Sequence, residues 1–355
     1  IDLDADADRQ VVVDQEEGVY LGHVSTLTLD DGSTILAAYP QGHGRGPIIL
    51  KRSTDGGQTW SDRLPTPPSW ETSQETPTLY RMGDTSIILF SGLYPIRAAR
   101  SHDDGQTWSQ LEPIGDFGGI VAMGDVYHRP DGSFAAFFHD DGRFFRAGGT
   151  PTGTFTLYQT DSANAGVTWS EPRALWSGSD VHLCEPGLVL SPDGTTLAML
   201  LRENRRARPS HIMLSHDHAR TWTPPRELPP ALTGDRHTAA YAPDGRLIIT
   251  FRCMRPDDPW QGDWVAWVGR WEDLLPPPEH PDTPATPTTY LVRLKDNLTR
   301  WDCAYSGLEV MPDGTLVATT YGTWTQGQQP YILCVRFTID QLDALAAPAP
   351  PGAAP

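Results

Sequence analysis

The sequence has few basic residues for its length. Its 355 residues include 27 lysines and arginines against 45 aspartates and glutamates, which gives a formal net charge of −18 at pH 7. A surface of this charge repels phosphate backbones and acidic lipid headgroups, because neutralising phosphates requires clustered Lys and Arg. We therefore expect neither nucleic acid nor a membrane as a partner.

Long hydrophobic runs and clustered cysteines are also missing. The longest apolar stretches, such as residues 86–90, fall far short of the ~20 residues that span a bilayer, so no transmembrane segment is expected. No C-x-x-C pair, metal-ligand spacing or glycine-rich phosphate loop occurs, so we expect no metal and no cofactor. The compartment stays open between secreted, periplasmic and cytoplasmic, and a monomer or small homo-oligomer is expected. The scattered cysteines are expected to be buried hydrophobes: Cys184, Cys253, Cys303 and Cys334.

Glycine and proline are abundant, with 33 of each, and the apolar stretches between them are short and alternating. Six Asp-Gly-type turns flanked by β-branched and apolar residues predict six hairpins. These turns recur roughly every 50 to 70 residues, a period that fits one four-stranded blade of a β-propeller. They lie at Asp31-Gly32, Gly83-Asp84, Asp131-Gly132, Asp193-Gly194, Asp244-Gly245 and Asp313-Gly314.

A second repeat, S-x-D-x-G-x-T-W, occurs out of phase with the hairpins. Its Ser, Asp and Thr side chains can satisfy turn amides, its Gly permits a positive φ, and its Trp can fill the gap between neighbouring sheets. Asn164 replaces the Asp of the third copy and Ala219 replaces the Gly of the fourth. The four copies are Ser53–Trp60, Ser101–Trp108, Ser162–Trp169 and Ser215–Trp222.

These octapeptides resemble the Asp-box, or bacterial neuraminidase repeat, of the sialidase superfamily. The resemblance implies an all-β fold, a six-bladed β-propeller of four-stranded antiparallel blades. We expect residues 1–345 to form this single domain and residues 346–355 a flexible tail. Residues 9–14 are expected to close the ring as the outer strand of the last blade, and the proline-rich segment 274–289 to be a long loop.

The hairpin turns also predict where a functional site lies. If each turn joins the innermost strand to the second, the start of strand one and the end of strand two share the opposite end of the blade, near the axis. Clustered ionisable groups in such a cleft indicate a site. The strand-one starts carry His23, Glu75, Gly118-Gly119, Glu185, Arg236-His237 and Tyr305. The strand-two ends carry Tyr39–Arg45, Tyr94–Arg97, His139-Asp140, Arg202-Glu203, Arg252 and Tyr321.

The resemblance to sialidases implies roles for three of these residues. Sialidases have a Glu at the start of blade four, followed about twenty residues later by an Arg, as Glu185 and Arg202 are placed here. They also have a Tyr leading into the last blade, which Tyr305 matches. By this comparison Tyr305 is the nucleophile and Glu185 its general base. A neutral phenol that loses its proton to a carboxylate suits an anomeric carbon that bears a carboxylate, because that carbon repels an anion.

The family holds the substrate carboxylate with three arginines, since guanidinium forks match a carboxylate. Arg202 matches the second, and Arg252 or Arg236 is the candidate for the third. At the first, this sequence has His23 instead. Arg45 is a candidate to approach the carboxylate from the loop 41–46.

The general acid is also unusual, because loop 41–46, where sialidases place an Asp, has no carboxylate. His23 or His43 is a candidate proton donor, and Glu75 and Asp140 are alternative acids. His237 and Asp140 are further candidates for substrate binding.

Three functions remain open from the sequence. The first is a retaining exo-glycosidase that removes terminal sialic acid or a related acidic sugar from a glycan or glycoconjugate. The second is another propeller carbohydrate enzyme, either an exo-arabinanase-like hydrolase with two carboxylates such as Glu75 and Glu185, or a uronate lyase with His and Tyr as acid and base. The third is a non-catalytic glycan-binding propeller, since a fold does not fix a function.

Overall fold

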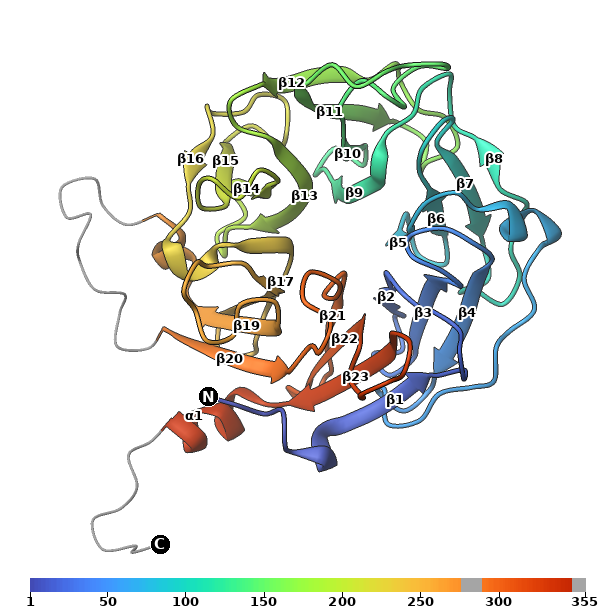
Figure 1. Cartoon of the computed structure of the whole chain (residues 1–355). Coiled ribbons are helices and arrows are strands. Elements are labelled where there is room, and N and C mark those ends of the chain that lie inside the picture. The colour runs from blue at the N-terminus through green and yellow to red at the C-terminus, as the bar shows by residue number, and fades with distance from the viewer. Residues whose placement is uncertain (276–288, 347–355) are drawn as a thin grey trace, which may run out of the picture.

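Six β-sheets surround a central axis in the computed structural model, which describes residues 1–275 and 289–346 (Figure 1). Most of the expected loop 274–289 and nearly all of the expected tail 346–355 lie outside the described residues. The first three blades consist of β2 (Ser25–Thr28), β3 (Ile35–Pro40) and β4 (Ile48–Ser53); β5 (Pro77–Arg81), β6 (Ile87–Ser91), β7 (Arg97–Ser101) and β8 (Glu112–Pro113); and β9 (Ile120–His128), β10 (Phe134–Asp140), β11 (Phe155–Ser162) and β12 (Arg173–Gly178).

The remaining blades follow the same order from the axis outward. They consist of β13 (Leu183–Leu190), β14 (Leu197–Glu203), β15 (His211–Ser215) and β16 (Arg226–Glu227); β17 (Gly234–Tyr241), β18 (Leu247–Cys253), β19 (Trp264–Gly269) and β20 (Tyr290–Lys295); and β21 (Gly307–Val310), β22 (Leu316–Gly322), β23 (Tyr331–Phe337) and β1 (Gln10–Asp14). Short helices connect or flank them: η1 (Ala7–Arg9), η2 (Pro68–Thr72), η3 (Pro230–Leu232), η4 (Trp271–Leu274) and α1 (Ile339–Ala346). The six-bladed propeller predicted from the repeats is confirmed.

The N-terminal strand closes the ring. β1 pairs antiparallel with β23, with Gln10 opposite Val335 and Val12 opposite Leu333, and the two strands lie side by side in Figure 1. This pairing joins the two ends of the chain in one sheet, as residues 9–14 predicted, and it removes an exposed sheet edge between the last and first blades.

The first blade has three strands within the described residues, where four were expected. The chain after β4 does run beside it, because Ser61 N donates to Arg52 O at 2.8 Å and Leu64 N donates to Leu50 O at 2.8 Å. Prolines follow at positions 65, 67 and 68. Since proline has no N–H, the ladder cannot continue and no fourth strand forms.

Each octapeptide forms a turn after the third strand of its blade. In the first copy, Ser53 Oγ accepts a hydrogen bond from Gly57 N at 2.8 Å, and Asp55 Oδ1 accepts one from Thr59 N at 2.9 Å. Gly56 N donates to Ser33 O in the first Asp-Gly turn at 2.9 Å. The octapeptides therefore lie at the hairpin-turn end of the blades, opposite the strand-one starts, and their role is structural.

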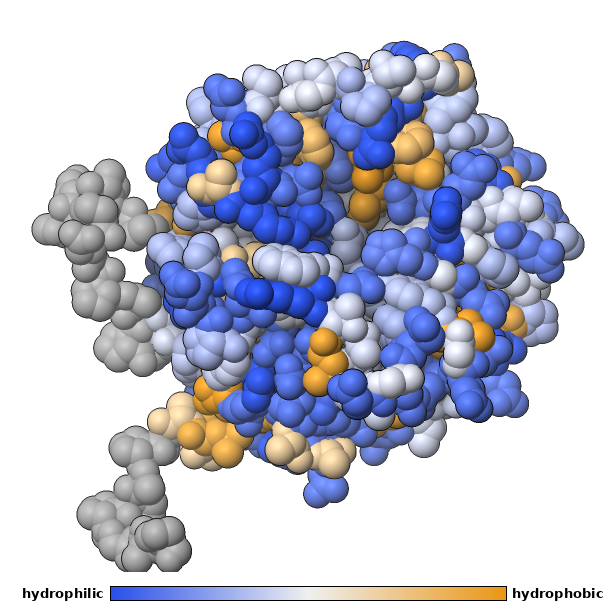
Figure 2. Space-filling model, in the orientation of Figure 1, coloured by the Kyte–Doolittle hydropathy of each residue, from blue (hydrophilic) through white to orange (hydrophobic). Residues whose placement is uncertain are grey.

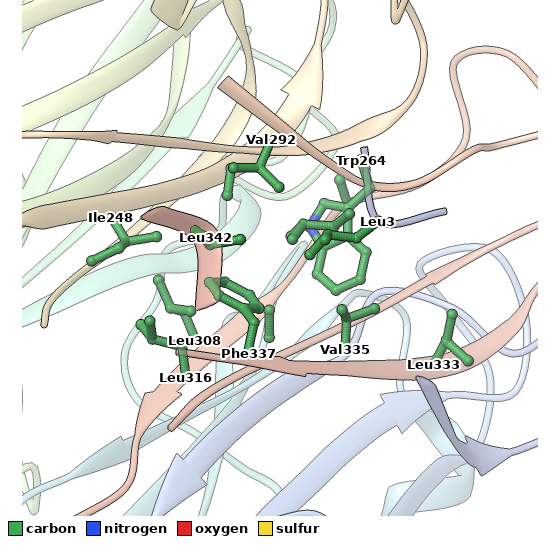
Figure 3. Packing of buried hydrophobic residues seen from close by; sticks show 14 of the residues in the cluster. Leu3, Ile248, Trp264, Val292, Leu308, Leu316, Leu333, Val335, Phe337 and Leu342 are labelled. Carbon is green, nitrogen blue, oxygen red and sulfur yellow. The ribbon is translucent and has the colours of Figure 1, made fainter. Parts of the chain in front are cut away.

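Neighbouring blades are held together by apolar side chains between the sheets. Figure 3 shows one such cluster between the fifth and sixth blades, where Trp264 of β19 and Phe337 of β23 pack with Leu342 of α1 and Leu3 of the N-terminal segment. All four are at most 1% exposed. The face seen in Figure 2 is mostly hydrophilic, and no helix among the described residues has the length and apolar character to span a bilayer.

Candidate active site

The inner ends of the blades are strained where the candidate residues lie. Five non-glycine residues at or beside the strand-one starts have left-handed backbones: His23 (φ 52°), Val121 (φ 48°), Glu185 (φ 52°), Arg236 (φ 57°) and Ala304 (φ 68°). The pairing of β13 with β14 shifts register just after Cys184, beside Glu185. A left-handed residue with a side chain costs roughly 1–2 kcal/mol, and such strain concentrates at functional sites. The left-handed backbones and the register shift change the direction in which the candidate side chains point.

Tyr305, Glu185 and Arg202 meet at one carboxylate oxygen. Tyr305 Oη donates to Glu185 Oε1 at 2.5 Å, and Arg202 Nη1 donates to the same oxygen at 2.7 Å. The three residues come from the sixth and fourth blades and from separate segments of the chain. Glu185 is 4% exposed, and its second oxygen, Oε2, is buried without a hydrogen-bond partner among the described residues. The structure therefore brings together the three residues that the sequence singled out first.

The environment keeps the phenol neutral and the carboxylate ionised. Burial has the largest effect and by itself would raise the pKa of Glu185, but the charge of Arg202 and the hydrogen bond from Tyr305 together outweigh it, and the pKa is lowered from its ordinary value of 4.5. Burial and the charge of Glu185 raise the pKa of Tyr305 well above 10. A proton on Tyr305 thus has an ionised acceptor in hydrogen-bond contact.

Arg202 and Arg252, which the resemblance assigned to a substrate carboxylate, already bind a carboxylate of the protein itself. Asp235 Oδ2 lies 2.5 Å from Arg252 Nη2, and its Oδ1 lies 3.1 Å from Arg202 Nε and 2.9 Å from Arg206 Nη1. We call Arg202, Arg206 and Arg252 the arginine cluster. Burial would raise the pKa of Asp235, but the arginine cluster holds it well below its usual range.

Asp235 and Arg206 were missed by the sequence reasoning. Asp235 stands directly before Arg236 at a strand-one start, so its place in the blade was a signal. Its partners were not, because they lie on other strands and on the loop after β14.

A hydrogen-bonded group of aromatic and acidic side chains links the first blade to the last. Asp302 accepts hydrogen bonds from Tyr20 Oη at 2.8 Å and Tyr321 Oη at 3.1 Å, and its Oδ1 lies 3.3 Å from His43 Nδ1. Tyr321 Oη is also 3.2 Å from His23 Nε2. The ring of His23 lies 4.7 Å from that of His43 and 4.4 Å from that of Tyr305, centroid to centroid. His23 therefore lies against Tyr305, and His43 lies against His23.

The two histidines differ in charge. Burial lowers the pKa of His23 well below 6.5, so this residue is neutral. The contact with Asp302 raises the pKa of His43 above 6.5, and the His43 side chain is 67% exposed. Its Nε2 has no hydrogen-bond partner within residues 1–275 and 289–346. His43 is thus a protonated, accessible group on the loop where a general acid was sought.

The two alternative acids have different environments. Glu75 accepts hydrogen bonds from Thr76 N at 3.0 Å and Val121 N at 3.3 Å, yet burial raises its pKa above 4.5. Asp140 accepts hydrogen bonds from Gly142 N at 2.6 Å and Phe144 N at 3.1 Å. Both oxygens of Asp140 thus hold its own loop, which makes it a loop-positioning residue rather than one that faces a substrate.

The three remaining candidates for substrate binding are His237, Arg236 and Arg45. His237 is 2% exposed, its Nε2 contacts Leu232 O at 2.9 Å, and its ring stacks on a phenylalanine of β18, so it is packed inside the blade. Arg236 lines a central cavity of about 260 Å³ and its guanidinium lies 5.8 Å from the ring centroid of Tyr305. Arg45 is exposed on loop 41–46. His237 lines the same cavity as Arg236, and its Nδ1 is buried without a hydrogen-bond partner among the described residues.

Comparison with known proteins gives a family for about half of the chain. Residues 7–181 match the family described as the BNR repeat-like domain. This match confirms the BNR-type repeat that the octapeptides indicated. No curated protein matches the chain in sequence.

Several solved structures share the propeller. A protein of unknown function from Dyadobacter fermentans is 16% identical with a TM-score of 0.69, covering 92% of this chain and 97% of that one. An α-L-arabinanase from Penicillium chrysogenum, complexed with arabinobiose, is 15% identical with a TM-score of 0.64, covering 92% and 97%. A leech intramolecular trans-sialidase is 15% identical with a TM-score of 0.65, covering 93% and 69%. At these identities the similarity establishes the fold alone.

Proposed function

We propose that this BNR repeat-like propeller is a glycoside hydrolase in which Tyr305 is the nucleophile and Glu185 its general base. The observation that carries this proposal is the 2.5 Å hydrogen bond from the Tyr305 phenol to Glu185. Support also comes from propellers of the same fold whose names refer to glycans, an arabinanase and a trans-sialidase.

The reaction takes two steps with balanced protons. In the first, Tyr305 Oη attacks the anomeric carbon and loses its proton to Glu185, while the bond to the leaving oxygen breaks and that oxygen takes a proton from His43. In the second, water attacks the anomeric carbon of the glycosyl-tyrosine and loses its proton to His43, and Tyr305 leaves with the proton from Glu185. Two displacements retain the anomeric configuration.

The pocket has the charges that these two reaction steps need. Because Arg202 keeps Glu185 ionised, the base is ready before attack. The phenol is neutral until attack, so no second anion is stored beside Glu185. The Arg236 guanidinium near the Tyr305 ring favours the negative charge that develops on it.

His43 is the proposed acid because it is both protonated and accessible. His23 is buried and neutral, and Asp140 is used within its own loop. Asp302 then acts as a positioning residue, since its contact with His43 Nδ1 leaves Nε2 to carry the proton toward the leaving oxygen.

A second candidate function follows from the two glutamates. The pKa of Glu75 is raised by burial and that of Glu185 is lowered by Arg202. Carboxyl groups whose pKa values are pushed apart are typical of an acid and base pair. In this arrangement Glu75 donates the proton, Glu185 activates water, and Tyr305 only positions Glu185, as in an arabinanase-like hydrolase.

The experiment compares Tyr305→Phe with Tyr39→Phe. Tyr39 is a matched control, because its buried phenol donates to Asp14 Oδ2 at 2.6 Å away from Glu185. Turnover of a panel of 4-methylumbelliferyl glycosides, containing an α-sialoside and neutral pyranosides and furanosides, is measured for both. If Tyr305 is the nucleophile, Tyr305→Phe loses about 10³-fold or more in kcat, while Tyr39→Phe keeps its rate, and a fluorinated glycoside labels Tyr305 in mass spectrometry.

Other outcomes separate the alternatives. A modest loss in Tyr305→Phe, no label on Tyr305 and a large loss in Glu75→Gln would favour the two-carboxylate hydrolase. No turnover of any glycoside by the wild-type protein, together with binding of glycans, would favour a non-catalytic propeller and reject both hydrolase mechanisms.

A further inference from the structure

We propose that the sugar bound next to Tyr305 is neutral, because Asp235 supplies from within the protein the carboxylate that the arginine cluster binds. This inference rests on the proposed function and names its substrate class. The resemblance to sialidases implies an acidic sugar, and that expectation depends on free guanidinium groups beside the nucleophile.

Asp235 is built into the cluster. Its side chain is 2% exposed, and each of its oxygens contacts at least one guanidinium: Oδ2 that of Arg252 at 2.5 Å, and Oδ1 those of Arg202 at 3.1 Å and Arg206 at 2.9 Å. Such an arrangement reproduces the recognition of a carboxylate by several arginines. The carboxylate in it belongs to the protein and does not leave.

Arg252 has no free fork for a ligand. Its Nε and Nη2 both donate to Asp235, and its Nη1 donates to the main-chain oxygens of Trp301 and Cys303. A guanidinium has five N–H groups, so these contacts use all but one. The Arg252 side chain is also only 5% exposed. It therefore positions Asp235 and the loop before Tyr305 rather than a substrate.

Arg202 is committed in the same way. Its Nη1 donates to Glu185, and its Nε lies 3.1 Å from Asp235 Oδ1 as an ion pair, although Nε makes no hydrogen bond within the described residues. A bidentate grip on a carboxylate needs two parallel N–H groups. Arg202 and Arg252 therefore present no such pair. The other candidate for the clamp, Arg236, lies 5.8 Å from the Tyr305 ring, and its Nη1 is buried without a hydrogen-bond partner among the described residues.

The first position of the clamp is uncharged as well. His23 occupies it, and burial keeps its imidazole neutral. The acidic groups Glu185 and Asp235 already offset two of the three charges of the arginine cluster, and Glu75 lies close enough to Glu185 for their charges to interact. An incoming carboxylate would meet these anions with Arg236 in place of a three-arginine clamp, and moving Asp235 aside would leave a buried charge unpaired. A neutral sugar meets neither cost.

The test measures binding and turnover with one acidic and several neutral ligands. Calorimetry uses 2-deoxy-2,3-dehydro-N-acetylneuraminic acid, whose carboxylate needs an arginine clamp. We expect no binding by the wild-type protein at millimolar concentration, and detectable binding by Asp235→Ala, which frees the guanidinium groups. The same leaving group on an α-sialoside and on neutral glycosides gives the matched kinetic comparison, and at least one neutral glycoside is expected to be preferred.

Micromolar binding of the dehydrated sialic acid by the wild-type protein, or turnover of the sialoside above that of every neutral glycoside, would overturn the inference. Asp235→Asn keeps the side-chain volume and is the second variant if Asp235→Ala fails to fold. The wild-type measurements decide in either case. The two proposals fail separately. Sialoside turnover that Tyr305→Phe abolishes overturns the neutral sugar and leaves Tyr305 as nucleophile. Turnover of neutral glycosides that stays unchanged in Tyr305→Phe overturns Tyr305 as nucleophile and leaves the neutral sugar.

Discussion

Replacement of Glu185 by glutamine is the most direct perturbation of the proposed chemistry. Glu185→Gln keeps the length and shape of the side chain and still offers an oxygen to Tyr305, but it removes the charge that accepts the proton. General base catalysis contributes typically 10² to 10⁴-fold, so kcat should fall by about that factor. The fold should survive, because Arg202 keeps its contact with Asp235.

The cost in stability follows from the burial of the ion pair. Removing one partner of a buried pair typically costs about 3–5 kcal/mol, and the low end applies here because Arg202 retains a second acidic partner. With an unfolding entropy of about 2.1 cal/mol/K per residue, about 3 kcal/mol corresponds in this 355-residue chain to a fall in Tm of roughly 4 °C. Differential scanning fluorimetry measures this shift on the same samples that are used for kinetics.

Glu203→Gln is the matched control for the Glu185 variant. Glu203 is a buried glutamate, 4% exposed, whose oxygens accept main-chain hydrogen bonds from His182 N and Ala207 N. We expect Glu203→Gln to lose stability and keep kcat, whereas Glu185→Gln loses both. The double variant Tyr305→Phe, Glu185→Gln should be no slower than the slower single variant, because the two residues act as a unit. A Glu185→Gln protein with kcat within about threefold of wild type would refute the assignment of the base.

Two further predictions concern the acid and the fold. Contact with Asp302 raises the pKa of His43 above 6.5, so kcat/KM should fall only when the pH rises through this raised pKa. Asp302→Asn should move this alkaline limb of the pH profile to lower pH. A limb that does not move would exclude His43 as the acid. His43→Gln should lose about 10²-fold with alkyl leaving groups and little with dinitrophenyl glycosides, which need no proton. Ala219 has a left-handed backbone, φ 65°, where the other octapeptides have glycine. Ala219→Gly should therefore raise the unfolding free energy, measured by chemical denaturation, by about 1 kcal/mol. A lower unfolding free energy would show that the backbone of Ala219 is not strained.

The sequence predicted the fold because its signals are local. Each Asp-Gly turn and each octapeptide satisfies its own hydrogen bonds within a few residues, as Ser53, Asp55 and Thr59 do, so their positions fix where the hairpins and blade ends lie. The number of strands in the first blade was less predictable. It depends on where prolines interrupt a ladder that the chain otherwise forms.

The candidate site was predictable to the extent that it follows blade geometry. Tyr305 and Glu185 stand at strand-one starts and Arg202 at a strand-two end, so periodicity alone brings them to one end of the ring. The same geometry also selected Asp140, whose side chain binds the main chain of its own loop. Position in a strand fixes the place of a Cα atom, but not the partner that its side chain finds.

The sequence alone thus determined the six-bladed ring, the end at which chemistry-bearing residues gather, and the identity of the phenol and carboxylate. Only the tertiary structure decided how the charges are paired. Asp235 meets Arg202 and Arg206 of the fourth blade, and Asp302 meets His43, across blade boundaries and at sequence separations that no local pattern encodes. The physical reason is that a buried charge takes whichever partner the packing of separate blades brings within reach, and that packing is a property of the closed ring.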